Sequence, residues 1–178
     1  VEVVAARQLK IPVIKRAELL GHLMAGKLGI AVAGTHGKTT VSALIAFILT
    51  ELNLDPTFIV GGILEDMGTN ARLGKGSHFV IEADEYDYTF LGLRPRIAVV
   101  TVIEMDHPDC FTDIEDMTLA FEHFVRLLPD GGTLVGCADQ PRVVQMLQRM
   151  RKDKAIEIVT YGLKDRSTWQ ARGVCGNA

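Results

Sequence analysis

The sequence predicts a three-layer α/β sandwich built on a mostly parallel sheet. Short runs rich in β-branched residues alternate with longer amphipathic stretches, the pattern of strands joined by helical crossovers. The chain has 178 residues, 48% hydrophobic and 23% charged, a balance typical of one globular core. We expect strands at residues 28–33, 57–60, 78–83, 96–102, 133–136 and 156–161.

Three helices are predicted from the 3.6-residue spacing of apolar side chains and from their capping residues. The first follows Thr39 and ends near Asn53, a residue that suits a left-handed terminator. The second begins at Thr112, whose spacing to Glu115 is that of a capping box. The third begins with Asp139 as its cap and ends near residue 150. The apolar stripe of the first helix comprises Val41, Leu44, Ile45, Ile48, Leu49 and Leu52.

Charge and cysteine content exclude several classes of function. The 19 Lys and Arg residues against 22 Asp and Glu residues give a net charge of -3, so nothing indicates a surface for nucleic acid or an anionic membrane. Cys110, Cys137 and Cys175 form neither a disulfide framework nor a zinc-binding pair. No stretch has the length of a membrane span or the pattern of a signal peptide. We therefore expect a cytoplasmic protein that acts on small molecules.

The chain divides into three parts. Residues 1–26 hold a short apolar run and one predicted helix, and we interpret them as the tail of a preceding domain or as a linker. Residues 27–163 form the core that carries the predicted strands. Residues 164–178 show no periodic pattern and are interpreted as an irregular tail.

The segment between the first strand and the first helix has the composition of a phosphate-binding loop. It comprises Gly34, Thr35, His36, Gly37, Lys38, Thr39 and Thr40. Small residues let backbone amides face an anion, and the start of the following helix adds partial positive charge. We expect Lys38 to reach the outer phosphates of a nucleotide and Thr39 to place its hydroxyl on Mg²⁺. The opening glycine of the full eight-residue pattern would fall at Val32, so the alternative is a glycine turn with a solvated lysine.

Four acidic residues lie at or just beyond the end of the strand predicted at residues 78–83: Glu82, Asp84, Glu85 and Asp87. In an open parallel sheet, ligands bind at the carboxyl ends of the strands, so a carboxylate here can face a metal ion held by the phosphate loop. We expect Glu82, the first beyond the apolar run, to be that ligand. The other three are equally compatible with a solvated acidic loop.

His107 follows the strand predicted at residues 96–102, among several carboxylates. A third strand end thus brings polar groups to the same edge of the sheet. Because neutral imidazole is a metal ligand, we expect His107 to bind a second Mg²⁺ or to orient a substrate phosphate. A purely structural histidine is the alternative.

In order and spacing, residues 34–40, 82–87 and 103–109 resemble the motifs of the central ATPase domain of the Mur ligases, a P-loop NTPase-like fold. The resemblance implies that ATP and Mg²⁺ are the cofactors. It also implies that Asn70, in the segment Gly68 to Ala71, contacts substrate, with a simple turn residue as the alternative.

The resemblance assigns roles to individual residues. Lys38 and Thr39 would serve the ATP phosphates and the first Mg²⁺, and Glu82 and His107 would hold magnesium near the reacting groups; Lys38, Glu82 and His107 are the residues implied to be catalytic. The chain departs from the family where Val102 replaces the Asn that precedes the histidine motif, which puts a polar contact in doubt.

The implied activity is formation of an amide bond through an acyl phosphate in the synthesis of peptidoglycan precursors. The most similar branch joins L-alanine to UDP-N-acetylmuramate, and a branch that joins a tripeptide to the same UDP-sugar is the runner-up. Residues 1–26 would then end a UDP-sugar domain. We expect the 178-residue chain alone to bind nucleotide but to be a poor or inactive ligase. A non-catalytic nucleotide-binding module is the alternative from a different class.

Overall fold

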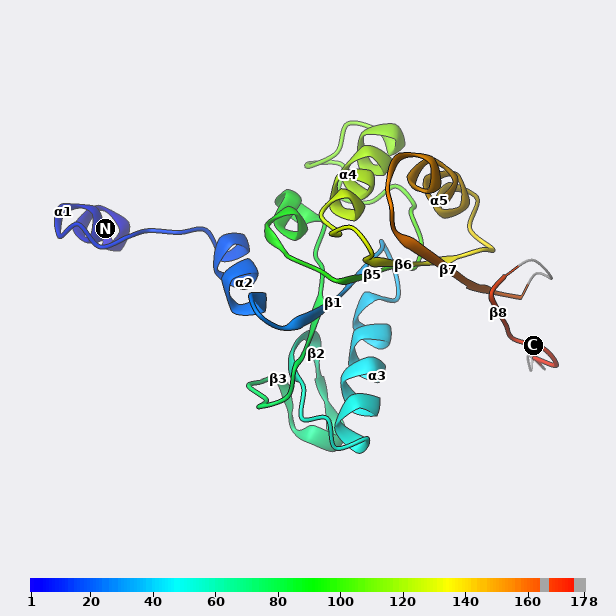
Figure 1. Ribbon diagram of the computed structural model, residues 1–178. Coiled ribbons are helices and arrows are strands. Elements are labelled where there is room, and N and C mark those ends of the chain that lie inside the picture. Colours follow the sequence, from blue (N-terminus) through cyan, green and yellow to red (C-terminus); the bar gives the residue numbers. More distant parts are fainter. Residues whose placement is uncertain (164–166, 175–178) are drawn as a thin grey trace.

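The computed structural model describes residues 1–163 and 167–174 and confirms the predicted α/β fold with a mostly parallel sheet (Figure 1). In these residues the strand order is β3-β2-β4-β1-β5-β6-β7-β8, and β2 with β3 is the one antiparallel pair. The strands are β1 (Leu28–Ala33), β2 (Thr57–Leu64), β3 (Thr69–Arg72), β4 (His78–Glu82), β5 (Ile97–Val100), β6 (Thr133–Cys137), β7 (Glu157–Gly162) and β8 (Trp169–Gln170).

Helices cover both faces of the sheet, which gives the three predicted layers (Figure 1). The α-helices are α1 (Glu2–Gln8), α2 (Arg16–Met24), α3 (Lys38–Glu51), α4 (Ile114–Arg126) and α5 (Pro141–Asp153), and the 3₁₀ segments are η1 (Glu65–Met67) and η2 (Tyr86–Gly92). On one face α3 packs on the side chains of Ile30, Phe58 and Val80. On the other face α2, η2, α4 and α5 share a larger core, in which the ring of Phe90 stacks on that of Phe124.

The predicted apolar stripe of α3 is only half in contact with the sheet. Its fully buried residues are Ser42 and Ala46, whereas Leu44, Ile48 and Leu52 are exposed. The small side chains of Ser42 and Ala46 let the backbone of α3 approach the strands closely. The face of α3 that contacts the sheet is therefore centred on these two residues and covers only part of the apolar stripe. The predicted apolar stripe is therefore only partly buried, and Leu44, Ile48 and Leu52 lie outside the contact with the sheet.

The start of α4 differs from the prediction by one residue. Asp113, and not Thr112, is the N-cap, and its carboxylate accepts a hydrogen bond from the amide of Asp116 (2.8 Å). The Asp116 carboxylate in turn accepts the amide of Thr112 (3.1 Å). The sequence contains two overlapping capping patterns, Thr112 with Glu115 and Asp113 with Asp116. The structure uses the second, so Glu115 takes no part in the cap.

α5 also starts later than predicted, whereas the predicted end of α3 is confirmed. Gln140 is the N-cap of α5 and Pro141 occupies the first turn, where its fixed φ suits a helix start. Asp139 instead accepts a hydrogen bond from the amide of Leu163 (2.7 Å), which ties α5 to the end of β7. Asn53 has a φ of 58°, as expected for a left-handed terminator.

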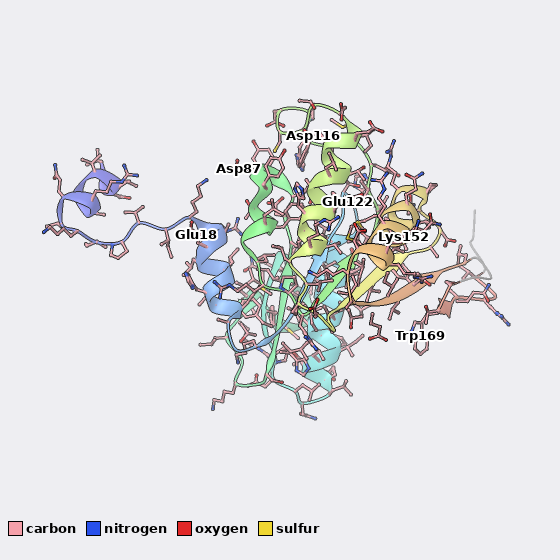
Figure 2. All side chains as sticks on the ribbon, turned by 45° about the horizontal axis from the view of Figure 1, so that its top comes forward. Glu18, Asp87, Asp116, Glu122, Lys152 and Trp169 are labelled. Atoms are coloured by element: carbon pink, nitrogen blue, oxygen red, sulfur yellow. The ribbon has the colours of Figure 1, made fainter. Side chains whose placement is uncertain are left out.

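The two ends of the chain contain elements that the sequence did not predict. The helix expected in residues 1–26 is α2, but α1 precedes it, has no buried residue and lies beyond α2 on the side away from the sheet (Figure 1). Within the predicted irregular tail, β8 pairs in parallel with β7, and Trp169 of β8 is 72% exposed (Figure 2). Residues 164–166 and 175–178, including Cys175, lie outside the described residues. None of the described helices is long and apolar enough to cross a membrane.

The sheet brings three of the predicted functional segments together. β1 lies between β4 and β5, with Val32 opposite Glu82 and Ala33 opposite Val100. The loops that leave these three strands therefore start side by side at one edge. This is the position at which an open α/β sheet binds its ligands.

Candidate functional site

The phosphate-loop candidate has the predicted strand, loop and helix order. β1 ends at Ala33 and α3 begins at Lys38, with Gly37 as the N-cap at a φ of 82°. The first amides of a helix have no partner inside the helix, so those at the start of α3 are available to an anion. A side chain at Gly34 would collide with the Thr101 hydroxyl, which explains why the loop opens with glycine.

The loop is fastened to the segment that follows β5. The Thr101 hydroxyl donates a hydrogen bond to the carbonyl of His36 (2.6 Å), and the amide of Thr35 donates to the carbonyl of Val102 (2.9 Å). The amide of Glu104 donates to the Thr35 hydroxyl (3.3 Å). Because Val102 takes part through its backbone, this link between the loop and the strand does not depend on a polar side chain at that position.

Lys38 forms an ion pair with Glu85, whereas Glu82 was the acidic residue predicted to bind a metal ion at this site. Its Nζ donates to the carboxylate of Glu85 (2.9 Å) and to the carbonyl of Gly34 (2.7 Å). The Glu85 side chain is fully buried, so its interpretation as part of a solvated loop is wrong, although Asp84 and Asp87 are indeed exposed. A buried carboxylate needs a charged partner, and Lys38 supplies it.

His107 joins the same cluster from the third strand end. Its Nε2 lies 3.9 Å from Glu85 Oε1 and 3.8 Å from Asp106 Oδ2. One ligand atom from each of these three residues lies within 4.8 Å of the others. The second oxygen of Glu85 is buried and has no hydrogen-bond partner in the described part of the chain. Two carboxylates and an imidazole at these distances could hold a metal ion, and carboxylate oxygens are ligands that Mg²⁺ takes.

The backbone and an aromatic ring fix the position of His107. His107 has a φ of 51°, a left-handed conformation that is uncommon outside glycine, and its carbonyl accepts the amides of Cys110 (2.8 Å) and Phe111 (3.0 Å). The ring of Tyr86 meets the imidazole edge to face, with the centroids 5.1 Å apart. The Tyr86 hydroxyl donates to Asp109 (2.9 Å), and this bond to a carboxylate raises the pKa of Tyr86.

Glu82 lies beside β2, close to the start of α3. Its carboxylate accepts the amide of Gly61 (2.7 Å), and a Cβ on Gly61 would lie 2.6 Å from the same oxygen. The methyl of Thr39 lies over the next residue, Gly62, where a Cβ would come within 3.3 Å of it. Glu82 and Thr39 thus lie against two consecutive glycines of β2, Gly61 and Gly62 respectively. No hydrogen bond or ion pair joins Glu82 to His107 within the described residues.

Asn70 lies apart from this cluster. It is an exposed residue of β3, the edge strand of the sheet, and not a turn residue. Its predicted contact with substrate stays a prediction. Asp106 was not predicted to be a member of the site, and the one available signal in the sequence was its position directly before His107.

Comparisons with known proteins identify the family and the fold of the chain. The family model described as the Mur ligase middle domain matches residues 32–175. The chain is similar to the solved UDP-N-acetylmuramate:L-alanyl-gamma-D-glutamyl-meso-diaminopimelate ligase from Neisseria meningitides, with 31% identity and a TM-score of 0.84. It is also similar to a murein peptide ligase from Psychrobacter arcticus (25%, 0.79) and to UDP-N-acetylmuramate-alanine ligase from Thermotoga maritima (26%, 0.72).

These relatives are longer than the chain. The matches cover 98%, 98% and 94% of this chain but 57%, 40% and 36% of the respective relatives. The strand order, the loop between β1 and α3 and the family match over residues 32–175 all lead to one assignment. The chain belongs to the Mur ligase family and carries the middle domain of that family.

Proposed function

We propose that the chain binds ATP for an amide ligase that activates the carboxyl group of UDP-N-acetylmuramate. The observation that carries the proposal is the meeting of Lys38, Glu85 and His107 beside the start of α3. An anion at the free amides of α3 would lie next to a lysine and to groups that can hold a metal ion. Two of the relatives are named for ligation to UDP-N-acetylmuramate, which supports that substrate.

The reaction has two steps. An oxygen of the substrate carboxylate attacks the γ-phosphorus of ATP, the bond to the bridging oxygen breaks and ADP leaves. The amine then attacks the carbonyl carbon of the acyl phosphate, phosphate leaves and the nitrogen loses a proton. Both steps depend on holding charged groups in line, so positioning and electrostatic stabilisation supply most of the catalysis.

Different residues of the site would bind the phosphates and the metal ions. The amides at the start of α3 and the ammonium of Lys38 would hold the phosphates. Thr39 and Glu82 would hold one Mg²⁺, and Glu85, Asp106 and His107 could hold another. Magnesium, when bound, neutralises the charge that develops on the transferred phosphoryl group.

The similarity to known ligases favours a tripeptide over L-alanine as the amine. The Neisseria ligase, which is named for a tripeptide, has higher identity and TM-score than the Thermotoga alanine ligase, 31% and 0.84 against 26% and 0.72. L-Alanine is the second candidate, since the sequence motifs resemble that branch. Both candidates share the UDP-sugar, the nucleotide and the acyl phosphate.

Two measurements test the proposal. Calorimetric titration of the protein should show saturable binding of ATP that strengthens with Mg²⁺, and no binding would refute the nucleotide site. In the protein at its full natural length, ATP, Mg²⁺ and UDP-N-acetylmuramate should give an amide product with the tripeptide or with L-alanine offered in parallel. Binding of ATP without product from either amine would favour the non-catalytic nucleotide-binding module.

A further inference from the structure

The positive charge of the phosphate loop is engaged by groups of the protein itself. Lys38 Nζ is turned back toward its own loop and contacts the carbonyls of Gly34 (2.7 Å) and Thr35 (3.5 Å) together with Glu85 Oε1 (2.9 Å). Its side chain is only 14% exposed. A lysine that is to bind a phosphate must therefore first leave the Glu85 carboxylate.

We propose that Glu85 is a positioning residue that holds Lys38 back in the free protein and exchanges it for His107 when a polyphosphate binds. The inference rests on the proposed nucleotide site and adds to it a competition inside the protein. Lys38 would contact either Glu85 or the phosphates, and the state of Glu85 would follow the occupancy of the loop.

The burial of Glu85 makes this competition strong. Its side chain has no exposed surface, so water does not screen its charge, and Lys38 is the fixed cation in contact with it among the described residues. A ligand must offer more negative charge than one carboxylate to remove the lysine. A triphosphate carries more negative charge than one carboxylate and can also accept hydrogen bonds from the free amides of α3. A single phosphate carries less negative charge than a triphosphate and makes fewer of these contacts.

His107 is placed to take over from Lys38. A buried carboxylate that loses its partner is costly, so Glu85 needs a new donor when the lysine departs. His107 Nε2 lies 3.9 Å from Glu85 Oε1, slightly beyond hydrogen-bond distance, and the neutral ring can donate from that nitrogen. The other Glu85 oxygen is buried and without a partner in the described chain, so it can accept the same donor. In the absence of a metal ion, nucleotide binding would thereby fix the imidazole beside Glu85. A metal ion held by Glu85 and His107 would take the place of this hydrogen bond.

The opposite role is that Glu85 holds Lys38 ready for the phosphates, and the two roles predict opposite effects of the same substitution. If Glu85 competes with the phosphates, Glu85→Gln should tighten nucleotide binding. If Glu85 supports Lys38, the same change should weaken it. Removal of a nearby negative charge could also tighten binding by a general effect, which needs its own control.

The test is a thermodynamic cycle on nucleotide affinity. ATP is titrated in chelator-containing buffer, so that metal ions do not contribute, into the natural protein, E85Q, K38M and the double variant K38M/E85Q. Asp87→Asn is the matched control, because Asp87 is an exposed acid at the start of η2 in the same loop (Figure 2). We expect E85Q to bind ATP about 10-fold more tightly, which corresponds to about 1.4 kcal/mol. D87N should stay within about twofold of the natural protein.

The K38M background separates the outcomes. With Lys38 absent, E85Q should change the affinity by less than about twofold, because there is no lysine left to release. Unchanged or weaker binding by E85Q overturns the proposal, and so does equal tightening in the K38M background. Glu85→Asp, which keeps the charge but shortens its reach, should tighten binding in the same direction and serves if E85Q does not fold. If the natural protein binds no ATP with or without Mg²⁺, the proposed nucleotide site is refuted. If it binds ATP but E85Q does not bind more tightly, only the competition between Glu85 and the phosphates is refuted.

Discussion

Replacing Lys38 with methionine should destabilise the protein in addition to weakening nucleotide binding. An exposed loop lysine could be removed without loss of stability, but Lys38 is one half of a buried ion pair. Its Nζ lies 2.9 Å from a carboxylate of Glu85 that is fully buried. Methionine keeps the length of the side chain and removes its charge, so the change isolates the electrostatic contribution.

The expected loss lies between two limits. Removal of one partner from a buried pair costs about 3–5 kcal/mol, since the other charge stays behind in a poorly solvated place. A carboxylic acid that cannot remain ionised takes up a proton instead, at a cost of about 3.7 kcal/mol at pH 7, which caps the loss. We therefore expect K38M to lower the free energy of unfolding by about 3 kcal/mol, or the Tm by roughly 6–12 °C for a chain of this length.

Urea denaturation of the natural protein, K38M, E85Q and K38M/E85Q at pH 7 measures this directly. The double variant should regain most of the stability that K38M loses, because glutamine leaves no charge in the buried position. A loss below about 0.5 kcal/mol in K38M, within the usual range for surface changes, would refute the reasoning. A double variant as unstable as K38M would refute it too, because the cost would then not come from the unpaired carboxylate.

Three further predictions concern the surroundings of the loop. Thr101→Val removes the donor to the His36 carbonyl (2.6 Å) and should cost about 1 kcal/mol in urea unfolding and weaken ATP binding severalfold; unchanged affinity would show that this bond does not position the loop. Glu82→Gln can still accept the Gly61 amide but should lose most of the gain in ATP affinity that Mg²⁺ gives, as magnesium titration would show. Burial raises the pKa of Tyr161 to about 12, so the folded protein retains a proton that the unfolded chain loses from about pH 10, and stability should fall between about pH 10 and 12. Tyr161→Phe should flatten that fall, and an unchanged slope would contradict the assignment.

The parts of the fold that local sequence determines were predictable. The alternation of apolar runs and amphipathic stretches indicated six strands of the parallel sheet, and β1 has the predicted bounds. The order of strand, glycine loop and helix that makes residues 34–40 a phosphate-loop candidate was predictable, because the three are consecutive in the chain. β3 was not predicted, since a four-residue antiparallel edge strand depends on its partner β2 and carries little pattern of its own. α1 has no buried residue, so no packing requirement shaped its sequence.

The roles of the four acidic residues Glu82, Asp84, Glu85 and Asp87 could not be assigned from the sequence, because they depend on partners that are distant in the chain. Asp84, Glu85 and Asp87 have similar local composition, and what separates Glu85 is an ammonium 47 positions earlier in the chain. Burial of a carboxylate is decided by such a partner and not by its sequence neighbours. The prediction from strand ends identified the edge of the sheet correctly, but it could not say which carboxylate faces which group.

The structure resolves this by separating two carboxylates only three residues apart. β4 ends at Glu82, whose carboxylate accepts the Gly61 amide of β2, whereas Glu85 lies beyond the strand and meets Lys38 and His107. Both acids belong to β4 and the segment directly after it, so a difference of three positions decides which neighbouring element each carboxylate meets. Lys38 is the first residue of α3, so a ligand at the free amides of that helix turn would lie beside the Lys38–Glu85 pair. In the proposed nucleotide site, occupancy of the loop would thereby be linked to Glu85 and His107, two of the groups that could hold a metal ion.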